Sequence, residues 1–241
     1  MGKKDKIFLE GNVSGLPFSF NQEVTEVFED MIDRSVPGYN TTLRIIHQQA
    51  KNHYVDGTNV YDLGCSLGAS TSSLLNALSG RSKIIAIDKS DSMVRSCAER
   101  FSDPIKTGQV NFLKEDISHS EIVNASIVVI NFVLQFLSIR ERAELMQKIY
   151  QGLVPGGILI LSEKIHFDSK KRTDEISCIH HSFKAANGYS KLEIASKRDS
   201  LEGVLVTETE SQHFDRAKEL GFKSSTKLMS NLNFSTYMFQ K

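Results

Sequence analysis

Short apolar runs alternate with helical patterns of apolar residues along the middle of the chain. The runs cover residues 59–63, 83–88, 109–114, 126–132 and 157–163. Those that begin at 83, 126 and 157 are almost continuously apolar, which is typical of strands covered on both faces. Because strands that alternate with helices over short connections form parallel sheets, the pattern predicts an α/β fold with a doubly wound, mostly parallel sheet.

Residues that commonly begin or end helices support this alternation. Ser90 precedes one helical pattern, and Ser138 with Glu141 three residues later forms a capping box before another. Asn21 precedes a helical pattern near the N-terminus, which Pro37-Gly38 ends. We therefore expect helices before the first strand as well as between the strands.

The alternation stops after Lys164. Residues 165–205 show two helical patterns separated by a loop, with a second capping box at Ser190 and Glu193 and without a strand. An insertion of this size in a doubly wound sheet is more often a lid or a dimer surface than a domain. We therefore predict a helical insert over this range.

Two β-rich runs, 223–229 and 234–240, follow a helical pattern that Gly221 ends. Only four residues join these runs, and a connection that short requires antiparallel pairing. The runs complete a seven-stranded sheet that finishes in an antiparallel hairpin.

Length and charge restrict the class of protein. The 241 residues suit one large domain, so we assign residues 1–241 to a single domain with 1–50 as an N-terminal helical cap. The 29 basic and 29 acidic side chains leave no net charge, so we expect no direct nucleic-acid binding. The first residues lack the apolar core of a signal peptide, and no apolar stretch is long enough to span a bilayer. We expect a cytoplasmic protein without a membrane partner.

The cysteines and histidines do not form a metal-binding pattern. Cys65, Cys97 and Cys178 are odd in number, far apart and free of C-x-x-C spacing, which argues against disulfides and a zinc site. The adjacent His180 and His181 would point about 100° apart on a helix, so they are poor joint ligands. We expect no metal.

Small and polar residues follow successive predicted strands. The first strand ends in Asp62 and the turn 64–68, the second in Asp88, the third run leads to Asp116-Ile117, and the fourth ends in Asn131. Ligands of open parallel sheets bind beyond these carboxyl ends. The turn can present free N–H groups, Asp88 can bind ribose hydroxyls, and Asp116 can accept from an adenine amino group. Each residue alone fits an ordinary turn or cap, but their succession predicts an adenosine-containing ligand.

The turn distinguishes a dinucleotide from S-adenosylmethionine. Gly64, Ser66 and Ala69 occupy the dinucleotide frame G-x-G-x-x-G/A, but its central glycine is missing. The frame G-x-G-x-G is matched at Gly64 and Gly68, with Ser66 as a single small substitution. Together with the C-terminal hairpin, this turn resembles the Class I S-adenosylmethionine-dependent methyltransferases.

Several blocks resemble a narrower family. They are VFEDMIDRSVPGY, VYDLGCSLGAS, NFVLQFL, ILILSEK, FKAANGYS and SKRDSLEGV, between residues 27 and 204. They are similar to the bacterial carboxy-S-adenosyl-L-methionine synthases and include the insert, which generic methyltransferases lack. The resemblance implies a homodimer that converts S-adenosylmethionine and prephenate to carboxy-S-adenosylmethionine and phenylpyruvate. Its product would serve the synthesis of 5-carboxymethoxyuridine at the tRNA wobble position.

The resemblance also implies a set of ligand contacts. They fall on Tyr39, Gly64, Cys65, Ser66, Asp88, Lys89, Asp116, Ile117, Asn131 and Arg198, and the strand-end pattern adds Asp62 and Gly68. We assign the special chemistry to Arg198, because its guanidinium can hold the new carboxyl group and stabilise negative charge at the methylene. Without the resemblance, Lys197-Arg198 is a solvated helix face and Tyr39 a packing residue. We expect Cys65 to contribute its backbone while its thiol packs inward, and whether Lys89 acts through its side chain or its backbone stays open.

Two other functions use the same pocket. An ordinary methyltransferase for a small molecule or tRNA is the main alternative, although NFVLQFL lacks the Asn/Asp-Pro-Pro-aromatic motif of amino-group methylation. A non-enzymatic adenosine-binding module is the other, and the intact Asp62 and Asp88 disfavour it. The sequence names no prephenate-binding residue and no general base.

Overall fold

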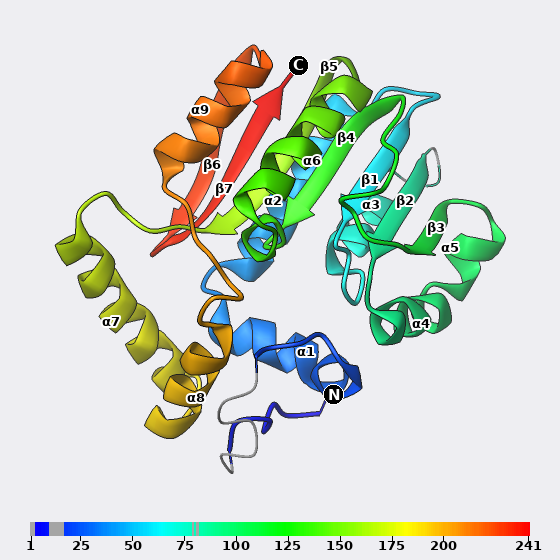
Figure 1. The fold of residues 1–241 in the computed structure, drawn as a ribbon. Coiled ribbons are helices and arrows are strands. Elements are labelled where there is room, and N and C mark those ends of the chain that lie inside the picture. The colour runs from blue at the N-terminus through cyan, green and yellow to red at the C-terminus, as the bar shows by residue number, and fades with distance from the viewer. Residues whose placement is uncertain (1–2, 10–16, 79, 81) are drawn as a thin grey trace.

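The computed structural model describes residues 3–9, 17–78, 80 and 82–241, and within them a seven-stranded sheet forms the centre of the molecule (Figure 1). The sheet order is β3-β2-β1-β4-β5-β7-β6. Strands β1 to β5 are parallel, and β7 lies antiparallel between β5 and β6. The strands are β1 (Asn59–Leu63), β2 (Lys83–Asp88), β3 (Val110–Lys114), β4 (Ala125–Asn131), β5 (Leu153–Lys164), β6 (Ser224–Asn231) and β7 (Phe234–Gln240). The predicted doubly wound sheet with its antiparallel hairpin is confirmed.

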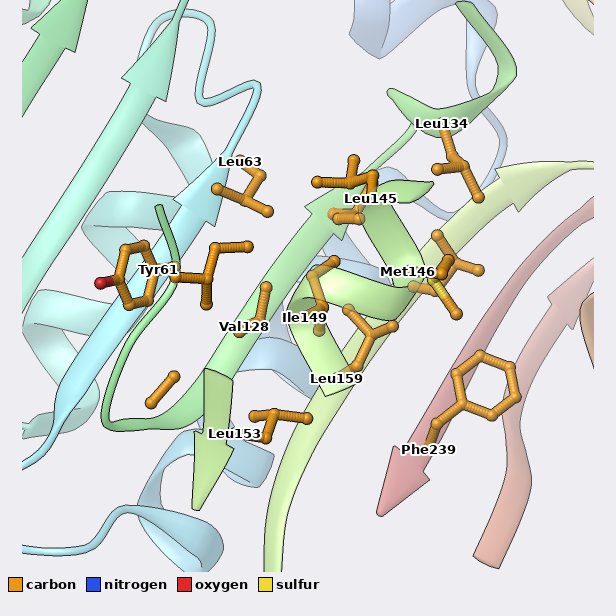
Figure 2. Packing of buried hydrophobic residues seen from close by; sticks show 14 of the residues in the cluster. Tyr61, Leu63, Val128, Leu134, Leu145, Met146, Ile149, Leu153, Leu159 and Phe239 are labelled. Atoms are coloured by element: carbon orange, nitrogen blue, oxygen red, sulfur yellow. The ribbon is translucent and has the colours of Figure 1, made fainter. Parts of the chain in front are cut away.

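Helices cover both faces of this sheet. One face carries α6 (Ile139–Gly152) and α9 (Glu210–Leu220), and the other carries α2 (Tyr39–His53), α3 (Ala69–Leu78) and α4 (Asp91–Arg100). Figure 2 shows the first face, where Leu145, Met146 and Ile149 of α6 lie against the apolar side chains of the central strands. The short element α5 (Ser102–Lys106) lies between α4 and β3, and η1 (Leu134–Phe136) lies between β4 and α6. None of the helices in the described part of the chain is both long and apolar enough to cross a bilayer.

Three further helices lie beyond the carboxyl ends of the parallel strands (Figure 1). They are α1 (Gln22–Ser35), α7 (Lys170–Ala186) and α8 (Lys191–Leu201). The last two form the predicted helical insert. Of the predicted N-terminal cap, α1 lies at the strand ends, whereas α2 packs on a face of the sheet; residues 1–2 and 10–16 lie outside the described residues. The insert and α1 therefore enclose the edge where a ligand is expected.

The predicted helix caps are confirmed by local hydrogen bonds. Asn21 and Ser90 each accept a hydrogen bond from a backbone N–H of the first turn. Ser138 and Ser190 form reciprocal capping boxes with the glutamates three residues later. Gly221 adopts the left-handed conformation after α9, with φ of 95°.

Two strand boundaries differ from the prediction by more than one residue. β5 begins at Leu153 rather than 157, because Leu153 pairs with Ala125 before an irregularity brings Ile158 opposite Ile127. β6 extends to Asn231, so two residues rather than four connect it to β7. Leu232 in that turn has a φ of 55°. Two-residue hairpin turns require positive φ, which the leucine did not suggest.

Candidate functional site

A cavity of about 600 Å³ lies at the carboxyl ends of the parallel strands, a volume common for small-molecule sites. Most of the predicted site residues line it: Tyr39, Gly64, Cys65, Ser66, Asp88, Lys89, Asp116, Ile117, Asn131 and Arg198. Asp62 and Gly68 do not line it. The fold thus brings together residues from the strand ends, α2 and the insert.

The turn after β1 is fixed by backbone hydrogen bonds and by a close side chain. The N–H groups of Gly64 and Cys65 donate to Ile87 O at 2.8 and 3.0 Å, so the prediction that the turn presents them free to a ligand is wrong. Gly64 has a φ of 77°, and a Cβ there would lie 2.5 Å from Val133 Cγ2. Ser66 also lies in the left-handed region, with a φ of 48°. Glycine is therefore required at the first position, whereas the serine accepts a conformation that glycine adopts more easily.

Asp88 connects this turn to the next helix. Its Oδ2 accepts from Ser66 N at 2.9 Å, and its Oδ1 accepts from Ser90 N at 2.9 Å. Each carboxylate oxygen has a second lone pair. Because Asp88 lines the cavity, these lone pairs can accept hydrogen bonds from ribose hydroxyls. Burial raises the pKa of Asp88, and the two backbone N–H groups oppose that effect. The residue can organise the turn and bind a ligand at the same time.

Asp62 and Gly68 stabilise the turn from beneath. Asp62 is 1% exposed and accepts a hydrogen bond of 2.6 Å from Thr71 Oγ1 of α3. Burial raises the pKa of Asp62 to about 7. Gly68 has a φ of 77°, and a Cβ there would lie 2.5 Å from the ring of Phe101. These two residues act on the position of β1 and α3 and not on the cavity surface.

Asn131 and Asp116 present polar atoms to the cavity from the ends of β4 and β3. Asn131 Nδ2 donates to Ser70 Oγ at 3.1 Å, while its buried Oδ1 has no hydrogen-bond partner among the described residues. Asp116 Oδ1 accepts from the N–H and the hydroxyl of Ser118, and Ile117 beside it is buried. A buried amide oxygen without a partner is costly unless a ligand donates to it.

Aromatic side chains border another part of the cavity. The rings of Tyr39 and Phe132 lie 6.2 Å apart between centroids, and Phe132 meets Phe234 edge to face at 5.8 Å. Burial raises the pKa of the Tyr39 hydroxyl, so it stays protonated. Tyr39 therefore both packs and faces the cavity, as its two predicted roles require.

The Cys65 thiol packs inward, as predicted. The residue is 4% exposed and belongs to the core on the α2 and α3 side of the sheet. A hydrogen bond with Cys97 and burial raise the pKa of the Cys65 thiol well above its ordinary value. The reactive form of cysteine is the thiolate, so this side chain is not a nucleophile.

Arg198 lies at the cavity from the insert side, on α8. Its Nε and Nη2 donate to Asp199 Oδ1 at 3.0 and 2.8 Å, and its side chain is 63% exposed. A guanidinium on such an exposed ion pair can exchange partners at little cost. The preceding Lys197 is only 8% exposed. The interpretation of Lys197-Arg198 as a solvated helix face is therefore wrong for Lys197.

Several residues that line the cavity were not predicted from the sequence. Lys164, Lys184 and Lys197 bring positive charge, and Phe20 and Phe136 bring an aromatic pair with centroids 5.3 Å apart. The lysines occur in three of the blocks that carried the family resemblance, so the signal was present. Their common cavity was not visible because they come from β5, α7 and α8.

No metal centre is evident in the described ranges. These residues contain no group of three or more histidine, cysteine or acidic side chains placed to hold a metal ion. The cavity is lined largely by apolar side chains, among which single carboxylates, amides, cations and histidines are interspersed. The expectation of metal-free chemistry stays a prediction.

Comparison with known proteins decides the family. A family model described as "Methyltransferase domain" matches residues 61–159. A carboxy-S-adenosyl-L-methionine synthase from Shewanella halifaxensis (strain HAW-EB4) is 43% identical over 233 residues, 96% of this chain and 96% of that protein. The chain belongs to the carboxy-S-adenosyl-L-methionine synthase family. Another relative of that name, from Actinobacillus pleuropneumoniae serotype 5b (strain L20), is 43% identical over 239 residues, 99% of each chain. The predicted family and its enzyme class, a transferase within the class I methyltransferases, are confirmed.

Solved structures agree on the fold. An O-methyltransferase family protein from Burkholderia thailandensis has a TM-score of 0.64 at 14% identity and covers 96% of this chain and 67% of its own. Human N-acetylserotonin methyltransferase in complex with SAM has a TM-score of 0.61 at 14% identity, over 91% of this chain and 55% of its own. At such identities the likeness concerns the fold alone.

Proposed function

We propose that the protein converts S-adenosylmethionine and prephenate to carboxy-S-adenosylmethionine and phenylpyruvate. We further propose that the product is the carboxymethyl donor for 5-carboxymethoxyuridine at the tRNA wobble position. The observation that carries the proposal is the full-length similarity to relatives named carboxy-S-adenosyl-L-methionine synthase. The cavity supports it, since it combines the adenosine-type residues of the strand ends with cations from the insert.

Residues at the strand ends would bind the nucleoside part. Asp88 would accept from the ribose hydroxyls, the cavity-lining residues Gly64 to Ser66 of the turn would pack against the methionine part, and Asn131 Oδ1 would accept a hydrogen bond from the ligand. These roles use atoms that already face the cavity. None requires a new buried charge on the protein.

The reaction balances without a further reactant. Prephenate loses a carboxylate as CO₂ and its ring hydroxyl as hydroxide, which leaves the aromatic ring of phenylpyruvate. The sulfonium acidifies its methyl protons, and removal of one by the departing hydroxide gives water and a sulfur ylide. The ylide carbon forms a bond to CO₂ and yields the carboxylated sulfonium.

Arg198 would stabilise the charge that develops in this step. The carbanion character at the methylene and the new carboxylate are both negative, and a guanidinium fork can bind a carboxylate through two N–H groups. Arg198 would leave Asp199 to do so, since that exposed pair is weak. The absence of an activated thiol at Cys65 agrees with a mechanism that needs no protein nucleophile.

Mass spectrometry of the reaction products tests the proposal. The protein incubated with S-adenosylmethionine and prephenate should form a product one CO₂ heavier than S-adenosylmethionine, together with phenylpyruvate. Arg198→Ala should abolish this product but retain nucleoside binding, whereas the exposed Arg140→Ala is the matched control. Methylation of an added acceptor without any carboxylated product would instead support the ordinary methyltransferase.

We also propose that two copies pair through the insert. Ile179 of α7 and Leu192 of α8 are 50% and 59% exposed, although both are apolar. Light scattering should give the mass of a dimer for the wild type and of a monomer for Ile179→Lys with Leu192→Lys. Ile139→Lys, at a 55% exposed site on α6, is the control. A monomeric wild type would contradict the pairing.

A further inference from the structure

Three cationic side chains meet at the insert side of the cavity. Lys164 ends β5, where the chain leaves the sheet for α7 (Figure 1), Lys184 lies on α7 and Arg198 on α8. We call Lys164, Lys184 and Arg198 the cationic wall. Because separate elements supply its members, the wall exists only in the folded chain.

Within the described part of the chain, no acidic group forms an ion pair with either lysine, Lys164 or Lys184. Lys184 is 7% exposed and Lys164 is half-buried, yet neither ammonium group has a hydrogen bond or an ion pair among the described residues. The carboxylates that line the cavity belong to Asp88, Asp116 and Glu202, and none pairs with either lysine. Buried ammonium groups are normally paired, because loss of hydration is costly.

The charges of the wall act on one another. Burial, and then the positive charges of Lys164 and Arg198, lower the pKa of Lys184 to about 8. Burial lowers the pKa of Lys164, and burial with Lys184, Lys164 and Arg198 lowers that of His181. An anion between these groups would offset the repulsion between the positive charges and would accept hydrogen bonds from the lysines. The wall is therefore built for an anionic ligand.

The proposed function, on which this inference rests, supplies a dicarboxylate. One of its carboxylates leaves as CO₂ and loses its charge, so a firm ion pair to that group would stabilise the ground state and slow the reaction. The other carboxylate, on the pyruvyl side chain, keeps its charge in the product. A pair of lysines can hold that group throughout without opposing the chemistry.

We propose that Lys164 and Lys184 bind the retained side-chain carboxylate of the co-substrate, while Arg198 faces the transferred carboxyl group. The neighbouring rings of Phe234 and His180 meet edge to face with centroids 5.0 Å apart, and both line the cavity, so they offer apolar contact to the six-membered ring. His180 Nε2 donates to Ser35 O at 2.7 Å, and burial lowers the pKa of His180 to about 3. The ring is thus neutral and adds no charge to the wall.

Phenylpyruvate is a direct probe, because it keeps the side-chain carboxylate and lacks the transferred one. Calorimetry should show that Lys184→Met and Lys164→Met each weaken phenylpyruvate binding at least about tenfold, the loss expected for one charged hydrogen bond. The KM for prephenate should rise similarly, and the Kd for S-adenosylmethionine should stay within about threefold. Lys171→Met, on the exposed side of α7, is the matched control and should change neither value.

The outcomes separate the two proposals. If both lysine variants bind phenylpyruvate as the wild type does and still form carboxylated product, the proposed role of Lys164 and Lys184 is wrong. The proposed function then stands. An equal loss of S-adenosylmethionine binding would also overturn the proposed role of the lysines, since they would then hold the methionine carboxylate. A wild type that forms no carboxylated product contradicts the proposed function. Calorimetry with phenylpyruvate still tests whether Lys164 and Lys184 bind a carboxylate. Thermal unfolding checks that each variant folds. If Lys184→Met does not fold, Lys164→Gln, at a half-buried position, repeats the binding test.

Discussion

Gly64→Ala is the sharpest test of the turn that begins the site. An alanine at position 64 would hold an L side chain at a φ of 77° and bring its Cβ 2.5 and 2.6 Å from the two Val133 methyl groups. Gly108 provides a matched control, because it has a φ of 73° and nothing within 4 Å of an added Cβ. The two substitutions therefore share the backbone cost and differ in the steric one.

The expected magnitudes follow from these two costs. A left-handed conformation costs an L residue ~1–2 kcal/mol, and overpacking costs ~1–3 kcal/mol. Gly64→Ala should lower the free energy of unfolding by ~2–5 kcal/mol and Gly108→Ala by ~1–2 kcal/mol. The reduced entropy of the unfolded chain, worth ~0.4–1 kcal/mol, acts on both and cancels in their difference.

Urea unfolding measures these differences, and calorimetry measures S-adenosylmethionine binding. Only Gly64→Ala should weaken binding, because it displaces the turn that lines the cavity. Val133→Ala removes the contacting methyl groups, so it should recover part of the loss in the Gly64→Ala background, with a coupling energy of ~0.5–3 kcal/mol. Equal destabilisation by the Gly64 and Gly108 variants, or no coupling to Val133, would refute the steric argument.

Three further results are expected. Asp88→Asn should raise the Kd for S-adenosylmethionine about 10- to 150-fold by calorimetry, because a hydrogen bond to a charged group contributes ~1.5–3 kcal/mol; an unchanged Kd would contradict its ribose role. Burial lowers the pKa of Lys197 to about 7, so the folded protein loses this proton at lower pH than the unfolded chain does. The stability of the wild type relative to Lys197→Met should therefore rise as the pH increases from about 7 to 10.5, and urea unfolding that gives the same difference at both ends would count against it. A thiol reagent should label Cys178 quickly and the buried Cys65 and Cys97 only after unfolding, which peptide mass spectrometry can follow.

Local features of the fold could be predicted because they depend on neighbouring residues. Helix caps such as Asn21 and Ser138 satisfy N–H groups within the next turn, so a few letters determine them. The alternation of apolar runs and helices similarly determined the parallel sheet and its ligand-binding edge. The positive φ of Leu232 was not predicted, because a leucine rarely adopts that conformation.

The places of the two strand-end aspartates were decided only by the tertiary structure. Asp62 and Asp88 end similar predicted strands, but α3 covers Asp62 and gives it Thr71 as a partner, whereas Asp88 faces the cavity. The sequence shows an aspartate at the end of each strand. It does not show which of the two a helix will bury. The sequence alone therefore supports an adenosine site that includes both aspartates, whereas the structure places only Asp88 at the cavity.

The sequence by itself determined the fold class, the caps, the turn and, through its resemblance, the family. Only the tertiary structure decided that Lys164, Lys184 and Arg198 share one cavity. These residues lie on β5, α7 and α8, and their spacing in sequence carries no period that relates them. The repulsion between their charges depends on how far apart they lie in space. The packing of the insert against the strand ends sets that separation.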